Sequence, residues 1–525
     1  MKKFSVPFLA MLTVAAASLA VQAQRVQSNP IVTQAKHVTT TVPFRDMAPV
    51  PWHNLSKVMP EHDRAPRPHL SNAPDSVAQT VILPEVGTTN LLNFDGITDA
   101  QGGGFVPPDT NASVGATQVV ETVNVAYAVY NKSTGALVFG PTNIQTLYSP
   151  LGGQCATGNL SDPVVNYDKA AARWVISMIA FNNSFSQNNL CTAVSTSSDA
   201  TGTYHLYSFS YGSVLPDYPK VGVWPDAYYV TTDSFPNGGL FSGAETCALN
   251  RTNMLLGNSA TSICFQRNTS DFALLPSDLD GATAPPSGSP NYQMDLATST
   301  KINLYKFHVD FTVPTNSTFT GPTQLTVASY SDACASTGDC IPQPRPGELL
   351  DALGDRLMFR LAYRNFGDHE ALVASHSIKA SGSGKAASAV RWYEVRSPGA
   401  SPAIFQSGTV GGGTSALAQW MGSIGMDKVG DIALGYSKSG KTAKPSIEYV
   451  GRIPTDPLGT MESASVIIAG AGVQTNSQHR WGDYSSMAID PADDCTFWYS
   501  QEYYSTNSSF NFRTRLASFK FTNCQ

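Results

Sequence analysis

A two-strand unit that recurs along the chain is the feature that most restricts its fold. The clearest copy spans residues 480–504, RWGDYSSMAIDPADDCTFWYSQEYY. Gly482 and Asp483 precede an apolar run, residues 491–494 are rich in turn formers, and a second run rich in Thr, Phe, Trp and Tyr follows. β-branched and aromatic residues favour pleated backbone, whereas Pro and Asp favour turns. The segment therefore predicts a β-hairpin.

Further copies of this unit begin at positions 107, 161, 216, 354 and, more loosely, 421. Each has an entry Asp or small residue, a short strand, a polar turn and a stronger strand. Recurrence of a two-strand unit at intervals of roughly 40–70 residues indicates a β-propeller. We predict an all-β protein with about seven four-stranded blades, with six or eight still open. No segment keeps apolar residues at helical spacing for three turns.

The N-terminal region predicts export. Lys2 and Lys3 precede an almost wholly apolar stretch over 4–19, and residues 21–23 form a small-x-small cleavage pattern. This stretch is short and Ala-rich for a membrane anchor, and no second long apolar run follows. We therefore expect a signal peptide over 1–23 and a secreted protein, periplasmic or extracellular, without a membrane span after signal removal.

The remaining sequence divides into two parts. Residues 24–90 are polar and Pro-rich without steady periodicity, so we predict a mostly irregular N-terminal arm. Residues 91–525 form the predicted propeller domain. Residues 91–94 are its first strand, which we expect to close the ring against the last blade.

Composition supports this fold and excludes one class of partner. The 525 residues include 42 Gly and 34 Pro, and 14% are charged, which suits an all-β protein with short connections. The net charge of -6 argues against nucleic acid, because binding phosphate backbones requires a concentrated basic surface. We expect a monomer.

The cysteines predict four disulfides. Eight cysteines agree with an oxidising compartment, and they allow 105 pairings in principle. Contacts in a repeat fold are mostly within a unit, so sequence neighbours should pair. No C-x-x-C pair occurs, and we predict no metal site. The expected pairs are Cys155–Cys191, Cys247–Cys264, Cys334–Cys340 and Cys495–Cys524.

One segment matches the sequence pattern of a nucleotide-binding motif. Residues 435–442, GYSKSGKT, match the P-loop expression, which requires a helix after the glycine loop. Pro445 and the strand-like residues 447–450 follow instead. We predict a polar hairpin turn here.

Several of these motifs together carry a resemblance. They are PPDTNASVG from 107, DPVVNYDKAAARWVISM from 162, DYPKVGVWPDAYYVTT from 217 and WGDYSSMAIDPADDCTFWYSQEY from 481. With the signal-like N-terminus, the chain resembles a group of secreted bacterial proteins with a sialidase-like β-propeller over most of 90–525. That group has no well-established common activity, so the resemblance implies the fold and export. Residues 490–498 lack the Ser and Gly of the sialidase S-x-D-x-G-x-T-W turn, so sialidase activity is not implied.

The entry aspartates are the first candidate site. In a propeller the first strand of each blade lines the central channel, and ligands usually bind at the face where these strands start. Carboxylates from different blades would converge there, and glycosidic cleavage requires one acid and one base or nucleophile. The alternative is that a residue repeated in most blades braces neighbouring backbone. The entry aspartates are Asp109, Asp162, Asp217, Asp355 and Asp483, of which Asp109, Asp355 and Asp483 are the candidate catalytic residues.

Basic and aromatic residues near these positions are candidate ligand-binding residues. Cations could form a basic mouth, and flat aromatic rings stack on sugars. The alternative is that the cations neutralise the aspartates and the tryptophans pack between blades. These candidates are Lys220, Arg356 and Arg480 with Trp224 and Trp481, whereas the turn residues Asp168, Asp226 and Asp490 are expected to be structural and on the opposite rim.

Two functional hypotheses therefore stay open. One is a secreted hydrolase or lyase that acts on an extracellular glycan or polysaccharide, and the other is a non-catalytic binding or surface-interaction propeller. The sequence assigns neither a cofactor nor a substrate, and it leaves open whether the protein is an enzyme.

Overall fold

The computed structural model describes residue 1 and residues 29–52, 62–64, 67–81, 83–335 and 337–525. Apart from its first residue, the predicted signal peptide lies outside this described part. No helix within the described residues is long and apolar enough to cross a membrane.

The all-β prediction is confirmed, because the three α-helices among the described residues have four or five residues each. They are α1 (Gln145–Tyr148), α2 (Gly153–Thr157) and α3 (Arg251–Leu255). The 3-10 turns are η1 (Phe44–Asp46), η2 (Ser149–Leu151) and η3 (Pro314–Asn316).

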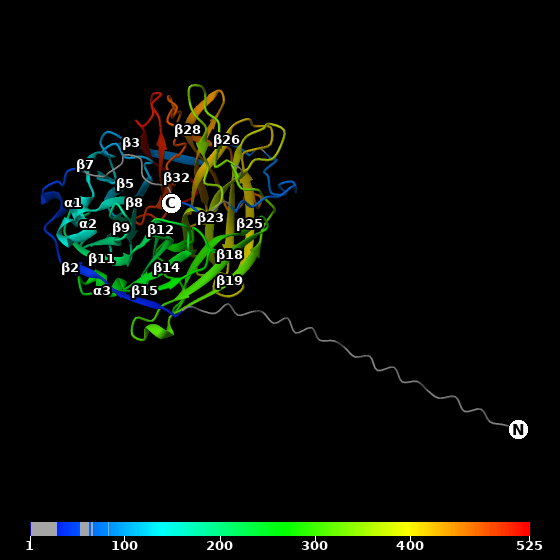
Figure 1. Cartoon of the computed structure of the whole chain (residues 1–525). Helices are drawn as coiled ribbons and strands as arrows, with labels where there is room; N and C mark the ends of the chain where they lie inside the picture. The colour runs from blue at the N-terminus through cyan, green and yellow to red at the C-terminus, as the bar shows by residue number, and fades with distance from the viewer. Residues whose placement is uncertain (2–28, 53–61, 65–66, 82, 336) are drawn as a thin grey trace.

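Most strands fall into seven consecutive units along the chain (Figure 1). Unit one has β4 (Asn111–Val114), β5 (Gln118–Val123), β6 (Ala126–Asn131) and β7 (Leu137–Asn143). Unit two has β8 (Asn159–Asp168), β9 (Arg173–Phe181), β10 (Asn188–Ser195) and β11 (Tyr204–Gly212). Unit three has β12 (Val214–Val223), β13 (Tyr228–Pro236), β14 (Ala244–Leu249) and β15 (Thr261–Gln266).

The remaining units follow the same plan. Unit four has β16 (Leu275–Asp280), β17 (Asn291–Thr298), β18 (Lys301–His308) and β19 (Thr318–Thr326). Unit five has β22 (Met358–Asn365), β23 (Glu370–Lys379), β24 (Ser388–Arg396) and β25 (Ala403–Val410). Unit six has β26 (Ala418–Met426), β27 (Ile432–Gly440), β28 (Ala443–Arg452) and β29 (Ser465–Ile468). Unit seven has β30 (Ser486–Ile489), β31 (Thr496–Tyr503) and β32 (Arg513–Phe521).

The first strands of the units lie side by side in chain order. β4, β8, β12, β16, β22, β26 and β30 each contact the next, and β30 contacts β4, so the order is cyclic. β16 also pairs with β22 in parallel, which joins units four and five in one sheet. The starts of all seven first strands therefore share one side of the molecule, and their ends share the other.

Strand β3 (Thr88–Thr98) completes unit seven by pairing antiparallel with β32. The prediction that residues 91–94 form a strand against the last unit is therefore confirmed. β1 (Ile31–Gln34) pairs with β15, and β2 (Lys36–Val38) pairs with β11, so the N-terminal segment adds edge strands to two units. A separate short pair, β20 (Asp339–Ile341) and β21 (Leu350–Asp351), lies between units four and five in sequence.

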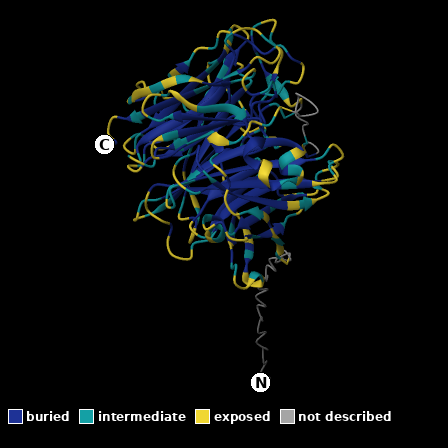
Figure 2. Cartoon of the chain, turned by 90° about the vertical axis from the view of Figure 1, so that its left-hand side faces the viewer, coloured by how far each residue is buried: buried dark blue, intermediate teal, exposed yellow. Residues whose placement is uncertain are grey.

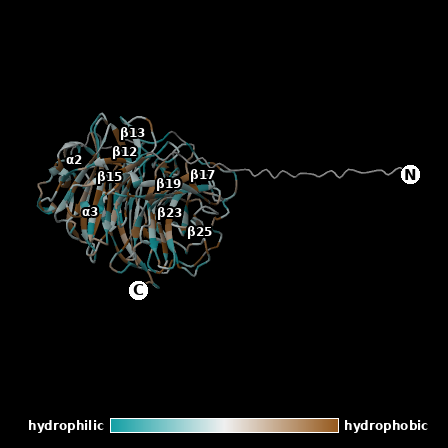
Figure 3. Ribbon diagram, turned by 90° about the horizontal axis from the view of Figure 1, so that it is seen from below, coloured by the Kyte–Doolittle hydropathy of each residue, from teal (hydrophilic) through white to brown (hydrophobic). Residues whose placement is uncertain are grey.

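The core lies between the sheets, and most strands are buried on both faces (Figure 2). In β9 eight consecutive residues are buried, and in β31 all eight are, which explains their nearly continuous runs of large residues. Figure 3 shows hydrophobic and hydrophilic segments interleaved along the strands.

Two further predictions are confirmed. The four disulfides join the expected neighbours, Cys155–Cys191, Cys247–Cys264, Cys334–Cys340 and Cys495–Cys524. The P-loop-like residues form the end of β27 and a tight turn into β28, and no helix follows them.

Candidate functional site

A backbone kink marks the start of most first strands, on the side that we call the entry face. Asp109, Asp162 and Asp483 have positive φ angles of 49°, 54° and 51°. Asp tolerates this left-handed conformation better than most residues, because its short side chain bonds locally. Three further units place non-aspartate residues in the same conformation near the start of the first strand. They are Tyr218 (53°), Ala273 (46°) and Met421 (54°).

The kink explains the repeated entry residue in the sequence. In β8, β12 and β26 the register shifts at the kink, so two residues bulge from the pairing with the next strand. The bulge in β12 places Tyr218, and not Asp217, at the left-handed position. Asp355 is not in this conformation. The repeated entry position in the sequence therefore reflects a left-handed backbone conformation, which several residue types adopt.

Lys220 lies at the centre of the entry face and is 1% exposed. Its Nζ lies 3.4 Å from the ring centre of Tyr218 and 4.0 Å from that of Tyr484, and it donates to the carbonyl of Pro219 at 3.1 Å. Burial lowers the pKa of Lys220 to about 8, although Asp162 and other nearby carboxylates oppose the shift. A cation between two phenol rings is stabilised by their π-faces.

Two buried carboxyl groups lie beside this lysine. Asp109 is 1% exposed and accepts a hydrogen bond from Asn124 Nδ2 at 3.0 Å, while its Oδ1 has no partner among the described residues. Burial raises the pKa of Asp109 well above its usual range, and Asp162 and Asp483 add to the shift. Burial likewise raises the pKa of Asp162 to about 6, with a further contribution from Asp217.

The other two candidate carboxylates are held by arginines. Arg480 binds Asp483 through Nε, 3.1 Å from Oδ1, and through Nη2 to the second oxygen. Arg356 is buried, and its Nε lies 2.9 Å from Asp355 Oδ1. Burial raises the pKa of Asp355, but Arg356 and Arg64 outweigh burial and leave that pKa below its usual value. These contacts are the internal neutralisation that the sequence left open as an alternative.

A short piece of the N-terminal arm lies across this face. Asp63 Oδ2 accepts from Arg356 Nη2 at 2.9 Å, and Arg64 Nε lies 3.6 Å from Asp355 Oδ2. His62 Nδ1 lies 3.6 Å from Asp217 Oδ2. The arm thus supplies charges to the predicted mouth and covers part of it. A hollow of about 290 Å³ remains beside Arg356 and the loop that carries the Cys334–Cys340 disulfide.

The two tryptophans do not form a surface at this mouth. Trp224 follows the end of β12, is 1% exposed, and packs edge-on against Tyr363 with ring centres 4.7 Å apart. Trp481 is also 1% exposed, donates to Ser437 Oγ at 3.0 Å and packs against Trp420 at 5.7 Å. The structure brings Lys220, Arg356 and Arg480 to one face, but both indole rings are interior packing.

Three groups at the entry face were not predicted from the sequence. Tyr484 Oη and Glu502 Oε2 are buried and have no hydrogen-bond partner in the described part of the chain. Asn124 bonds Asp109 through its amide nitrogen and the backbone of Asp162 through its amide oxygen. The two tyrosines around Lys220 each follow an aspartate, at 217–218 and 483–484, so the repeated Asp-Tyr pair was a usable signal.

Two groups of possible metal ligands occur among the described residues. The two groups of three ligand atoms that lie close enough together each include two disulfide-bonded cysteines, which offer no thiolate. They are Glu245 with Cys247 and Cys264, and Asp427 with Cys495 and Cys524.

Comparison with known proteins gives weak likenesses. No protein-family model and no curated protein sequence matches the chain. An exo-β-1,3-galactanase from Clostridium thermocellum is similar with a TM-score of 0.30 and 10% identity over 80% of this chain and 87% of that chain. An α-L-arabinanase from Penicillium chrysogenum gives 0.35 and 11% over 69% and 98%. The WD40 domain of SCAP from fission yeast gives 0.33 and 10% over 77% and 82%. TM-scores this low carry no argument about the activity of this chain.

Proposed function

We propose that residues 88–525 form a seven-bladed β-propeller that acts on or binds extracellular glycans at its entry face. The cyclic order of the first strands supports the propeller. The four disulfides agree with a protein outside the cytoplasm.

The observation that carries an enzymatic function is the contrast between carboxyl groups on one face. Burial favours the protonated form of Asp109 and raises the pKa of Asp162 to about 6, whereas Asp483 forms an ion pair with Arg480. Environments that separate the protonation of neighbouring carboxyl groups define an acid and a base. Glycoside hydrolysis requires that pair. In this proposal Asp109 donates the proton to the leaving oxygen, and Asp483 acts as base or nucleophile.

A second function, glycan binding without chemistry, is favoured by a different observation. Asp355 and Asp483 are already paired with arginines, and other units fill the entry conformation with Tyr, Ala or Met. The arm residues Asp63 and Arg64 also lie over Arg356 and Asp355.

A polysaccharide panel separates the two functions. The purified protein is incubated with neutral and acidic polysaccharides, and both reducing-end release and retention on each immobilised polysaccharide are measured. For a hydrolase, Asp109→Asn and Asp483→Asn abolish release, whereas Asp368→Asn, at a side chain that is 82% exposed, leaves it unchanged. Retention without release identifies the binding protein. Neither release nor retention on any polysaccharide would overturn the glycan proposal.

A further inference from the structure

A second hollow lies at the opposite ends of the first strands, on the side that we call the far rim. It has a volume of about 500 Å³ and is bounded by the ends of β8, β12 and β16 and by the turn after β30. The turn between β4 and β5 also contributes, so the walls come from five units and the hollow exists only in the assembled ring.

Small side chains create the hollow. Its lining includes six alanines from four turns, Ala116, Ala170, Ala172, Ala282, Ala284 and Ala492. These residues leave space where larger side chains would close the rim, and they make the walls mainly apolar. Binding sites for small molecules are usually concave and apolar with a few placed polar groups.

Most charged groups in the wall are already paired. Asp168 accepts from Arg251 at 2.6 and 3.0 Å and from the Tyr228 hydroxyl at 2.9 Å. Asp494 accepts from both terminal nitrogens of Arg364 at 2.7 Å. These carboxylates and guanidinium groups are committed to the rim itself.

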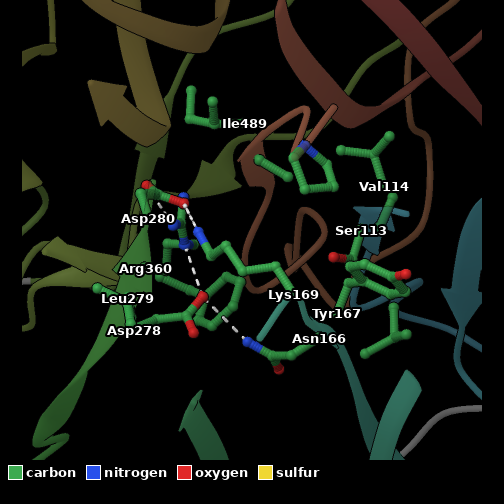
Figure 4. Close-up of a pocket in the computed structure, with 15 residues that line it drawn as sticks. Ser113, Val114, Asn166, Tyr167, Lys169, Asp278, Leu279, Asp280, Arg360 and Ile489 are labelled. Atoms are coloured by element: carbon green, nitrogen blue, oxygen red, sulfur yellow. Dashed lines mark hydrogen bonds and ion pairs between the residues drawn. The ribbon is translucent and has the colours of Figure 1, made fainter. Parts of the chain in front are cut away.

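Lys169 also forms an ion pair, but a longer one than these groups make (Figure 4). Its Nζ lies 3.6 Å from Asp280 Oδ1, beyond hydrogen-bond distance, and Asp280 is shared with Arg360 at 2.5 Å. Among the described residues no hydrogen bond uses the three donors of this ammonium group. Burial lowers the pKa of Lys169, and Arg364 adds to the shift against the opposing effect of Asp280. The side chain is 17% exposed, and it lines both the far-rim hollow and a smaller adjoining one.

We propose that the far-rim hollow binds a compact apolar monocarboxylate, with its carboxylate on Lys169 and its apolar body against the alanine-lined wall. A carboxylate supplies the acceptors that the ammonium lacks, and a charge-assisted contact in a mainly apolar hollow is stronger than one in open solvent. The site is independent of the entry face, so it stands whether or not the proposed glycan function is correct.

The test compares two probes that share a naphthalene ring and differ in the polar group, which is a carboxylate in one and a neutral alcohol in the other. Binding of 2-naphthoate and of neutral 2-naphthalenemethanol to the full-length protein is measured by calorimetry. Lys169→Met should weaken 2-naphthoate binding about tenfold and leave 2-naphthalenemethanol binding unchanged. Ala282→Trp, at an exposed position, should abolish binding of both probes by filling the hollow. Lys441→Met, in the exposed turn before β28, is the matched control and should change neither.

Two results would overturn the proposal. One is no 2-naphthoate binding at millimolar concentration, and the other is binding that survives Ala282→Trp. If Lys169→Met does not fold, Lys169→Arg keeps the cation, and Ala282→Trp still decides whether the hollow is the site.

Discussion

Charged side chains are paired differently at the two ends of the first strands. At the entry face, carboxyl groups and cations are packed against one another, against tyrosine rings and against the arm, and the hollow beside Arg356 measures about 290 Å³. At the far rim the charges pair at the walls and leave about 500 Å³ of mainly apolar space, and Lys169 there has an ion pair but no hydrogen bond to any described residue. Charge density alone therefore does not identify the more accessible site. The useful distinction is between charges that are hydrogen-bonded to each other and an ammonium group that makes no hydrogen bond within the described residues.

The largest expected effect lies in the buried charges behind the far rim. Arg360 is 5% exposed, and it pairs with Asp278 at 2.9 Å and with Asp280 at 2.5 Å. Arg360→Met leaves both carboxylates without this partner and should lower the free energy of unfolding by about 3–5 kcal/mol. Urea denaturation measures the loss. Arg356→Met should cost less, because its partners Asp63 and Asp355 are 35% and 25% exposed. Equal losses would show that the two ends hold their ion pairs alike.

The entry face should show its own pH dependence of stability. The folded-state pKa of Asp162 is raised from 3.8 to about 6, so the folded state binds more protons than the unfolded state between those values. Stability should therefore fall as pH rises from about 4 to about 6, by on the order of 2 kcal/mol for this group. Asp162→Asn should flatten that part of the profile of unfolding free energy against pH. An unchanged slope in the variant would assign the dependence to other carboxyl groups.

Lys169 and Lys220 should differ in reactivity. Lys169 is 17% exposed in its hollow, whereas Lys220 is 1% exposed between two rings, and burial lowers the pKa of both. Trace acetylation of the native protein at pH 8, followed by peptide mapping, should label Lys169 at least about tenfold faster than Lys220, because only the first is accessible. Saturating 2-naphthoate should slow labelling of Lys169 alone. Faster labelling of Lys220 would mean that the entry face opens readily.

The smallest effect is expected where the arm meets the entry face. Asp63 is 35% exposed, and Arg356 keeps Asp355 when Asp63 is removed. Asp63→Ala should therefore change the free energy of unfolding by no more than about 1 kcal/mol. A loss similar to that of Arg360→Met would show that the arm is an integral part of the entry face.

The units could be predicted from the sequence because each repeats the same local pattern of apolar runs separated by turn residues. The disulfides followed, because contacts within a unit join sequence neighbours. The candidate site was harder, because proximity in sequence was taken for proximity in space. Lys220 and Trp224 are four residues apart in extended backbone, so roughly 13 Å separates them along the chain. Lys220 therefore lies at the entry face, whereas Trp224 lies at the far rim.

The far-rim hollow had no sequence signature. Its alanines come from turns in different units, and alanine in a turn is unremarkable by itself. Lys169 likewise occupies an ordinary turn between β8 and β9, and only the assembled ring shows that its neighbours are already paired. A site of this kind depends on which hydrogen-bond acceptors face a donor in the folded protein. A pattern in the sequence does not contain that information.

The pairing of β3 with β32 has a consequence for how the chain is made. β3 is synthesised before every complete unit, yet its partner is the last strand of all. β3 is therefore made early but pairs late, and its edge stays unpaired while six complete units are synthesised. A circular permutant that begins at β4 and carries β3 after β32 would finish each sheet in turn. It should give a higher yield of folded protein if that wait limits assembly.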